Sequence, residues 1–152
     1  MNVLDENLIG LNVDANSAEA CIRYAADLFL KHGYVREGYG DAVVLREKTY
    51  PTGLPGKGIN IAIPHTNNSL VIKPAVGVLI PKAPVEFMMM GTKDKPLSCD
   101  LILPLVIKDS RMQITMLRKI MKIIGDSETL AKIKASKSKK EIMQYLGSLN
   151  ME

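Results

Sequence analysis

The 152-residue sequence is poor in cysteine, histidine and aromatic residues. It has two cysteines, two histidines, two phenylalanines, five tyrosines and no tryptophan. The cysteines lack paired spacing, which argues against a disulfide framework or a zinc module. Because few aromatic side chains are available to stack on bases, the net charge of +4 does not predict nucleic-acid binding. We expect no nucleic acid, no metal and no cofactor.

Long apolar runs are also absent. No stretch approaches the roughly 20 residues that a membrane-spanning helix requires, and residues 1–6 lack the basic and apolar parts of a signal peptide. We therefore expect a cytoplasmic protein with no direct membrane insertion. The sequence has no His-x-x-x-His, clustered Cys/His or Gly-x-Ser-x-Gly pattern, which disfavours a metal-dependent or triad hydrolase. Five lysines are interpreted as a solvated helical face that could attract an acidic partner: Lys132, Lys134, Lys137, Lys139 and Lys140.

A histidine at the end of an apolar run is the most informative feature present. Ile59, Ile61 and Ile63 alternate with small or polar residues, which is the two-residue period of a β-strand. Pro64 has no backbone N–H, so it ends the strand and carries His65 beyond the sheet, where an imidazole could act as a nucleophile. The alternative is a loop histidine without chemistry. The polar loop that follows offers donors to any anion held on the ring: Thr66, Asn67, Asn68 and Ser69.

The pattern along the rest of the chain predicts alternating strands and helices. A helix capped by Ser17 ends at Gly33, and a shorter one runs from Asp41 to about Lys48. The Pro- and Gly-rich loop 51–58 is expected to lack regular structure. Apolar runs at residues 75–80, 85–88 and 101–107 are expected as strands, the last largely buried.

The C-terminal part is expected to be wholly helical. In the first helix there, one stripe is predicted to face the core: Ile114, Leu117, Met121 and Ile124. Gly125 ends that helix, and two short helices follow, capped by Asp126 or Ser127 and by Ser138. The chain is thus predicted to be one α/β domain over residues 1–152, with a single central mixed sheet flanked by helices. The methionines at 88–90 are interpreted as core, with a partner-facing patch as the alternative.

Several motifs together resemble one family. The Arg46-Glu47 pair is followed by a Pro-Thr-Gly loop and then by Gly-Ile-Asn-Ile-Ala-Ile-Pro-His-Thr at residues 58–66. The helix ending in Lys-His-Gly-Tyr-Val at residues 31–35 and the late helix after residues 101–107 extend the match over nearly the whole chain. This sequence is similar to the fructose–mannitol type of enzyme IIA, from the bacterial sugar phosphotransferase system. The resemblance implies a mannitol-type enzyme IIA fold.

The resemblance also implies a phosphoryl carrier. His65 would accept phosphate from the histidine phosphocarrier protein and pass it to a cysteine of enzyme IIB, which works with the membrane component IIC. Neutral imidazole, with an ordinary pKa near 6.5, is available as a nucleophile at cytoplasmic pH. Arg46 matches the family's arginine near the phosphohistidine, and a guanidinium can grip two phosphate oxygens; its alternative is an ordinary surface arginine. Thr66 is a further candidate phosphate contact.

One position departs from the family pattern. Many members carry a second histidine at the start of the late helix, and here that place holds Gln113. Glutamine can orient the His65 ring or contact phosphate but cannot shuttle protons; alternatively, it faces water. Glutamine there and the long loop from Thr49 to Gly58 resemble galactitol-type members, so a galactitol-like or related polyol system is the expected pathway.

Three further expectations concern the alternative function, the rim of the site and the other histidine, His32. A phosphohistidine-based regulator of the nitrogen type, which binds targets without feeding a transporter, is the alternative function. Because a relay protein must release both partners, the rim around His65 is expected to be apolar, with contributions from Leu54 or residues 88–90. His32 ends a helix and is expected to be structural.

Overall fold

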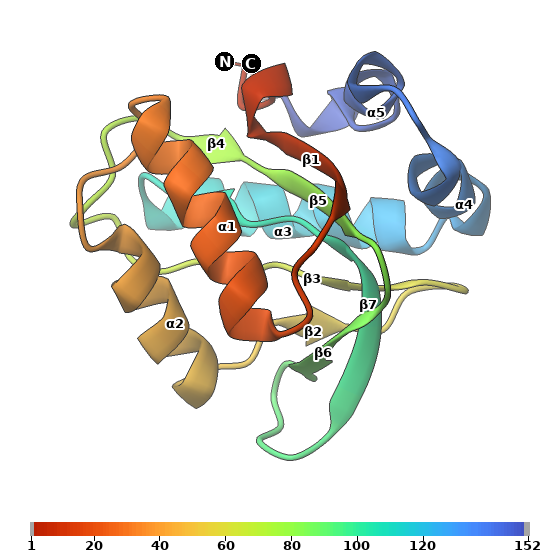
Figure 1. The fold of residues 1–152 in the computed structure, drawn as a ribbon, viewed down its shortest axis with the longest axis horizontal. Coiled ribbons are helices and arrows are strands. Elements are labelled where there is room, and N and C mark those ends of the chain that lie inside the picture. Colours follow the sequence, from red (N-terminus) through yellow and green to blue (C-terminus); the bar gives the residue numbers. More distant parts are fainter. Residues whose placement is uncertain (1, 151–152) are drawn as a thin grey trace.

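The computed structural model describes residues 2–150, which form a central sheet with helices on both faces (Figure 1). The strands of the main sheet are β1 (Ile9–Val13), β2 (Gly53–Leu54), β3 (Asn60–Ala62), β5 (Val78–Pro81), β6 (Val85–Met88) and β7 (Pro96–Ile102). The strand order is β1-β5-β7-β3-β2, with β6 also paired to β7. The pairs β1–β5 and β3–β7 are parallel and the others antiparallel, so the sheet is mixed, as predicted.

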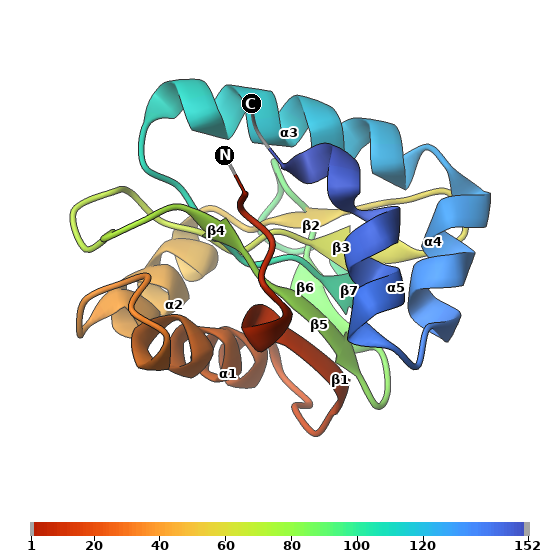
Figure 2. The same cartoon turned by 90° about the horizontal axis from the view of Figure 1, so that it is seen from above.

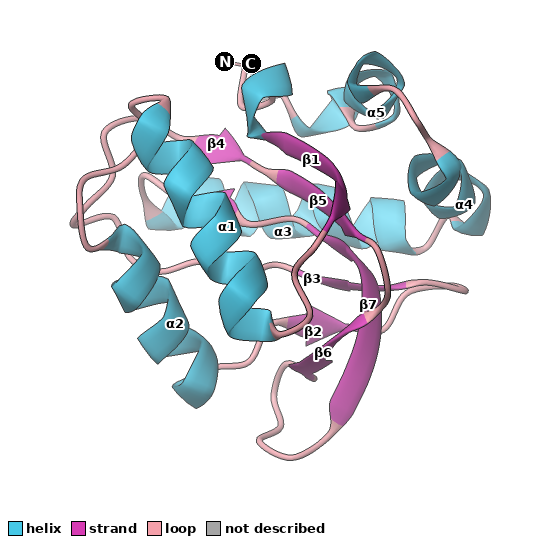
Figure 3. Cartoon of the chain, viewed as in Figure 1, coloured by secondary structure: helices cyan, strands magenta, loops and turns pink. Residues whose placement is uncertain are grey.

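Two helical layers cover this sheet. The helices α1 (Ala18–Lys31) and α2 (Tyr39–Thr49) lie on one face, and α3 (Ser110–Ile124), α4 (Ser127–Ala135) and α5 (Lys139–Tyr145) lie on the other, as the view from above shows (Figure 2). Short 3-10 helices, η1 (Glu6–Leu8) and η2 (Gly147–Leu149), stand near the two ends of the described chain. From α3 to residue 150, every helix or strand that the structure describes is a helix (Figure 3). The predicted helical C-terminal part is confirmed.

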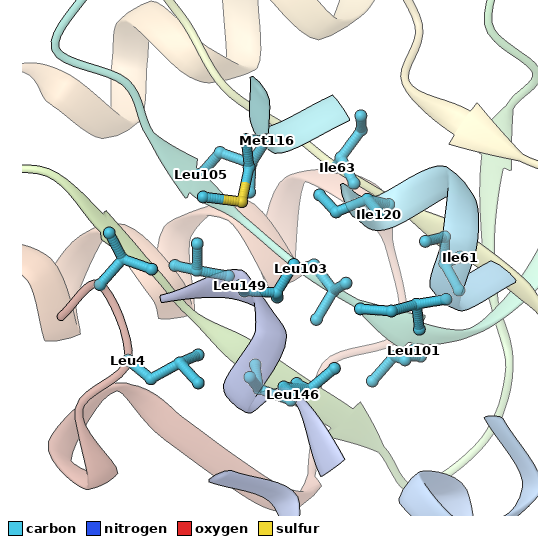
Figure 4. Close-up of a cluster of buried hydrophobic side chains, with 14 of the residues drawn as sticks. Leu4, Ile61, Ile63, Leu101, Leu103, Leu105, Met116, Ile120, Leu146 and Leu149 are labelled. Carbon is cyan, nitrogen blue, oxygen red and sulfur yellow. The ribbon is translucent and has the colours of Figure 1, made fainter. Parts of the chain in front are cut away.

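Side-chain alternation along the central strands builds two separate cores. Ile61 and Leu101 face α3–α5 and pack with Met116, Ile120 and the C-terminal leucines (Figure 4). Ala62 and Ile102 point to the opposite face, toward the core formed with α1 and α2. Because both faces are covered, the central strands are buried on both sides.

Helix caps follow the predicted residues closely. Ser17 accepts a hydrogen bond from the backbone N–H of Ala20 and begins α1, and Gly33, with φ of 82°, follows the helix end. Asp126 and Ser138 cap α4 and α5, as two of the predicted candidates. The five lysines of this region are exposed, with Lys132 paired to Glu128 and Lys134 to Asp100.

Two predicted strands and one predicted loop differ from the structure. The run at residues 101–107 divides, because Pro104 cannot donate to a ladder: β7 ends at Ile102, and β8 (Leu105–Val106) pairs instead with β4 (Ala75–Val76). The run at residues 75–80 divides at Gly77. Loop 51–58 contains β2, since Gly53 and Leu54 pair with Ala62 and Ile61.

The predicted core stripe of α3 is wrong at two of its four positions. Ile114 is 61% exposed and Met121 is 50% exposed, and the buried positions are Met112, Met116, Ile120, Ile123 and Ile124. Both sets have helical spacing, so periodicity alone cannot choose between them. The packing of the helix on the sheet decides: it leaves Ile114 and Met121 at the surface, whereas Ile124 is buried and Leu117 packs against the core, as predicted.

Candidate functional site

His65 lies at the end of the segment that leaves β3. The Ile63 N–H donates to the Thr52 carbonyl at 3.2 Å, and the Leu105 N–H donates to the Pro64 carbonyl at 3.0 Å. After β3 ends at Ala62, these bonds hold residues 63–64 between Thr52 on one side and Leu105 on the other. The His65 side chain is consequently fixed and only 6% exposed.

The two ring nitrogens of His65 have different partners. Nδ1 lies 2.7 Å from the carbonyl oxygen of Ile63. A carbonyl oxygen can only accept, so the neutral ring carries its proton on Nδ1. Nε2 lies 3.5 Å from the Gln113 side-chain nitrogen, a long contact in which the amide donates. The electron pair of the neutral ring is therefore on Nε2.

The surroundings of His65 favour the uncharged ring. Burial lowers the pKa of His65 below its ordinary value; the hydrogen bond to Ile63 opposes this shift, and the charge of Arg46 adds to it. An uncharged imidazole retains the electron pair that a nucleophile needs. The site thus holds His65 in its reactive protonation state.

A cleft of about 500 Å³ opens in front of His65. Its walls come from the end of α2 and the residues after it, from the β6–β7 hairpin, and from α3. The lining includes Arg46, Thr49, Tyr50, Thr52, Met90, Thr92, Lys93, Gln113 and Leu117. The structure therefore brings His65, Arg46 and Gln113 together in one cleft, although they lie far apart in the sequence.

Arg46 presents its guanidinium in this cleft. Its central carbon lies 5.4 Å from the centroid of the Tyr50 ring, a cation–π contact. Among the ion pairs found within residues 2–150, none involves Arg46. Its N–H donors are thus available to an anion in the cleft.

Glu47 is a site residue whose role the sequence did not reveal. Its carboxylate accepts from the Thr52 N–H at 2.8 Å and from the Thr52 hydroxyl at 2.7 Å. Burial raises the pKa of Glu47, while the two hydrogen bonds from Thr52 oppose the rise. Of the adjacent pair, Arg46 therefore lines the cleft, whereas the Glu47 carboxylate is bonded to Thr52.

Most side-chain hydrogen bonds of the polar loop after His65 are made within the loop or to a neighbouring backbone carbonyl. Thr66 is buried and is not among the residues that line the cleft, so its contact with phosphate stays a prediction. The Asn67 side chain accepts from the Ser69 N–H and hydroxyl, and Asn68 donates to the Lys108 carbonyl. His32 is half-buried at the end of α1 and does not line the cleft.

Two predictions about the rim require correction. Leu54 is buried at 8% exposure in the core against α3–α5, because its pairing with Ile61 turns its side chain inward. Leu54 is therefore not a rim residue. The interpretation of residues 88–90 as core is also wrong: Met88 and Met89 are half-buried, and Met90 is exposed at the cleft.

Among the hairpin residues that line the cleft, Met90 lies within the predicted rim segment 88–90, whereas Thr92 and Lys93 were not predicted. The Met90 N–H donates to the Gly53 carbonyl, and a Cβ at Gly53 would lie 2.7 Å from the Met88 carbonyl oxygen. Glycine thus permits the close approach that brings the hairpin to the cleft. A glycine in a Pro-Gly loop does not reveal which distant segment will approach it.

Two further features of the described residues concern membrane spans and metal ligands. Within residues 2–150, every helix is too short or too polar to cross a bilayer. The same residues contain no cluster of three or more His, Cys, Asp or Glu side chains suited to a metal ion. Both cysteines are free and buried.

Comparison with known proteins agrees with this fold. The profile of the family described as "Phosphoenolpyruvate-dependent sugar phosphotransferase system, EIIA 2" matches residues 2–148. Over 151 residues, 97% of each chain, the sequence is 25% identical to the mannitol-specific phosphotransferase enzyme IIA component of Halalkalibacterium halodurans.

Two solved structures show the same fold. One is enzyme IIA for mannitol from Escherichia coli, in a complex with phosphorylated enzyme IIB (TM-score 0.78, 23% identity, 97% of this chain and 99% of that one). The other is the nitrogen regulatory protein IIA-Ntr from Neisseria meningitidis (TM-score 0.78, 20% identity, 95% and 96%). The fold and the matched profile define a phosphotransferase component. The chain belongs to the EIIA type 2 family of the phosphoenolpyruvate-dependent sugar phosphotransferase system, and it is a phosphoryl carrier of that system.

Proposed function

We propose that this protein carries the phosphoryl group on Nε2 of His65. The observation that supports this most is the ring's arrangement: Nδ1–H is bound to the Ile63 carbonyl, and the Nε2 electron pair lies in a cleft beside Arg46, which has no acidic partner among the described residues. The proposed donor is the histidine phosphocarrier protein. The proposed acceptor is a cysteine of enzyme IIB, working with membrane IIC.

Each transfer exchanges one bond to phosphorus for another. In loading, the Nε2 electron pair forms the N–P bond, while the P–N bond of the donor phosphohistidine breaks and its electrons return to the donor ring. In unloading, the enzyme IIB thiolate forms an S–P bond, and the N–P electrons return to Nε2. Nδ1 keeps its proton throughout, so no general acid or base is required of Gln113.

The charged and polar groups of the cleft suit this transfer. Phosphoryl transfer depends mainly on alignment and on stabilising charge on the three equatorial oxygens. Arg46 can bind two of these oxygens, and the Gln113 amide can donate either to them or to the free Nε2. The Ile63 carbonyl accepts from Nδ1–H and stabilises positive charge that develops on the ring during attack.

The surface around the cleft suits transient docking of two protein partners. Tyr50 after α2 and Met90 in the hairpin are exposed and line the cleft. On α3, the exposed side chains Ile114 and Met121 lie about one turn before and after the cleft-lining Leu117. Such a patch is typical of a protein-binding surface. We infer that these residues, rather than Leu54, form the apolar rim.

We propose a galactitol-like or related polyol as the sugar of this system. The support is Gln113 in place of the second histidine, together with the long loop from Thr49 to Gly58. The alternative is a nitrogen-type regulator that binds targets without supplying a transporter. Neighbouring reading frames for enzymes IIB and IIC, and polyol-dependent phosphorylation of the co-encoded enzyme IIB, favour the carrier; their absence together with target binding favours the regulator.

The direct test is labelling with phosphoenolpyruvate and the general phosphotransfer proteins. The wild type is expected to gain one acid-labile phosphate that a co-purified enzyme IIB can remove. The variant His65→Ala is expected to gain none. Equal labelling of both proteins would show that His65 is not the carrier residue.

A further inference from the structure

A half-buried carboxylate, that of Glu47, lies one residue from Arg46 and takes no direct part in the proposed transfer. The Glu47 carboxylate is occupied by the backbone N–H and the hydroxyl of Thr52, at 2.8 and 2.7 Å. Thr52 is only 1% exposed, so both donors are shielded from water. A carboxylate suits this place, because it has two acceptor oxygens for two donors that would otherwise be buried without partners.

Thr52 is in turn bonded to the segment that carries His65. Its carbonyl accepts from the Ile63 N–H at 3.2 Å, immediately beyond the pairing of Gly53 with Ala62. The Ile63 carbonyl then accepts from His65 Nδ1–H at 2.7 Å. Three successive hydrogen-bonded contacts therefore connect Glu47, through Thr52 and Ile63, to the ring of His65.

The other end of α2 is fixed to the opposite side of the same segment. The hydroxyl of buried Tyr39 donates to the Leu105 carbonyl at 2.7 Å, and the Leu105 N–H donates to the Pro64 carbonyl at 3.0 Å. Tyr39 and Arg46 are seven residues apart, so they share one face of α2. The helix that carries Arg46 is thus held at both ends against residues 63–65.

We propose that Glu47 is a positioning residue, which holds Thr52 and Ile63 so that the Ile63 carbonyl keeps the proton of His65 on Nδ1 and directs Nε2 into the cleft. The proposal rests on the proposed function, since it assigns Glu47 a role in loading His65. Glu47 touches neither phosphate nor the reacting nitrogen. A displacement of about 1 Å at a reacting group can cost up to about 100-fold in rate, so loss of this support is expected to affect loading.

The experiment compares four variants. Glu47→Ala removes both acceptor oxygens. Glu47→Gln keeps both contacts without the charge, because its amide oxygen can accept from the Thr52 N–H while its NH₂ donates to the Thr52 hydroxyl. Thr52→Val removes one contact and preserves side-chain shape. Glu86→Ala is the matched control, since Glu86 is an exposed glutamate on β6 beside the same groove as Glu47.

Loading is measured with two donors, the phosphorylated histidine phosphocarrier protein and the small molecule phosphoramidate. In the second reaction Nε2 attacks phosphorus and ammonia leaves, so no protein docking is involved. Glu47→Ala is expected to slow loading by both donors about tenfold or more. Thr52→Val is expected to slow both about threefold, and Glu47→Gln to remain within about threefold of the wild type. Glu86→Ala is expected to match the wild type.

The tautomer of His65 provides a readout that does not depend on phosphorylation. In ¹⁵N NMR spectra, the wild-type ring is expected to carry its proton on Nδ1, and Glu47→Ala is expected to show a mixture of Nδ1–H and Nε2–H forms. A purely structural role for Glu47 would lower the unfolding temperature without changing the tautomer of the folded protein. Glu47→Gln is expected to restore the wild-type spectrum.

The outcomes separate this proposal from the proposed function. Wild-type loading and an unchanged tautomer in Glu47→Ala would overturn the positioning role while leaving His65 as the carrier. A wild type that is never loaded would refute the proposed function, and the NMR comparison would still decide the positioning role. If Glu47→Ala does not fold, Thr52→Val decides: unchanged rate and tautomer in that variant would overturn the proposal.

Discussion

His65 Nδ1 lies 2.7 Å from the carbonyl oxygen of Ile63, two residues earlier in the chain. Pro64 lies between them, and the chain turns there so that the His65 ring contacts the Ile63 carbonyl. This contact assigns the proton to Nδ1 and the electron pair to Nε2. It makes the isomer of phosphohistidine a specific expectation, because only attack by Nε2 retains the bond to Ile63.

The first prediction concerns the acid limit of loading. Burial of His65, aided by the charge of Arg46, lowers its pKa, so the ring stays neutral below the value near 6.5 of an unperturbed histidine. The rate of loading by phosphoramidate, corrected for ionisation of the reagent, is therefore expected to fall only below about pH 6.5. An NMR titration of the His65 ring gives the pKa directly, and a value above that of an unfolded reference peptide would contradict the expectation.

The same shift has a consequence for stability. The unfolded chain binds a proton at His65 near pH 6.5, whereas the folded protein binds it only at lower pH. Protons thus bind preferentially to the unfolded state as pH falls through this window, and the free energy of unfolding decreases. Urea unfolding of wild type and His65→Gln at pH 7.5 and 5.5 is expected to show the larger loss in the wild type. Equal losses would mean that His65 has the same pKa in both states.

The next prediction concerns the shape of the cation in the cleft. Arg46→Lys keeps the positive charge but loses the planar pair of donors for two phosphate oxygens. Loading is expected to slow about tenfold or more, with little change in the unfolding free energy. Lys48→Arg, on an exposed site of the same helix, is the control. A fully active Arg46→Lys would show that charge alone suffices.

Gln113 is expected to assist without being essential. It is exposed, and its contact with His65 Nε2 is long at 3.5 Å. Gln113→Leu is expected to slow loading by less than about tenfold and to change the unfolding free energy by less than about 0.5 kcal/mol. Complete loss of loading in a folded Gln113→Leu protein would show that the amide has a direct role in the transfer.

A pair of aspartate substitutions distinguishes rim from core. Ile114→Asp places a charge at an exposed position, so it is expected to slow exchange with the protein partners while leaving the phosphoramidate reaction and stability unchanged. Leu54→Asp buries a charge and is expected to destabilise the fold by about 3 kcal/mol or more. A stable Leu54→Asp protein with slowed transfer would instead place Leu54 on the rim.

The sequence predicted features governed by local chemistry. The Ser17 cap, the glycine after α1 and the proline that ends the strand before His65 act through their own backbone or near neighbours, and the structure contains all three. His65 and Arg46 were recognised through the family motif, and the structure places both in one cleft.

Features governed by distant packing were not predictable. Ile114 and Met116 both belong to apolar sets with helical spacing, and only the position of α3 on the sheet determines which set is buried. Leu54 has an apolar side chain in a loop-like sequence, yet pairing with Ile61 turns it inward. The role of Glu47 depends on the hydrogen bond from the Thr52 N–H to its carboxylate near the end of α2, and no sequence motif indicates this contact.

The most direct test of the account is the position of the phosphate. Mass spectrometry and NMR of protein loaded under alkaline, phosphohistidine-preserving conditions are predicted to find one phosphoryl group, on Nε2 of His65. A phosphate on another residue, or on Nδ1 of His65, would contradict the account.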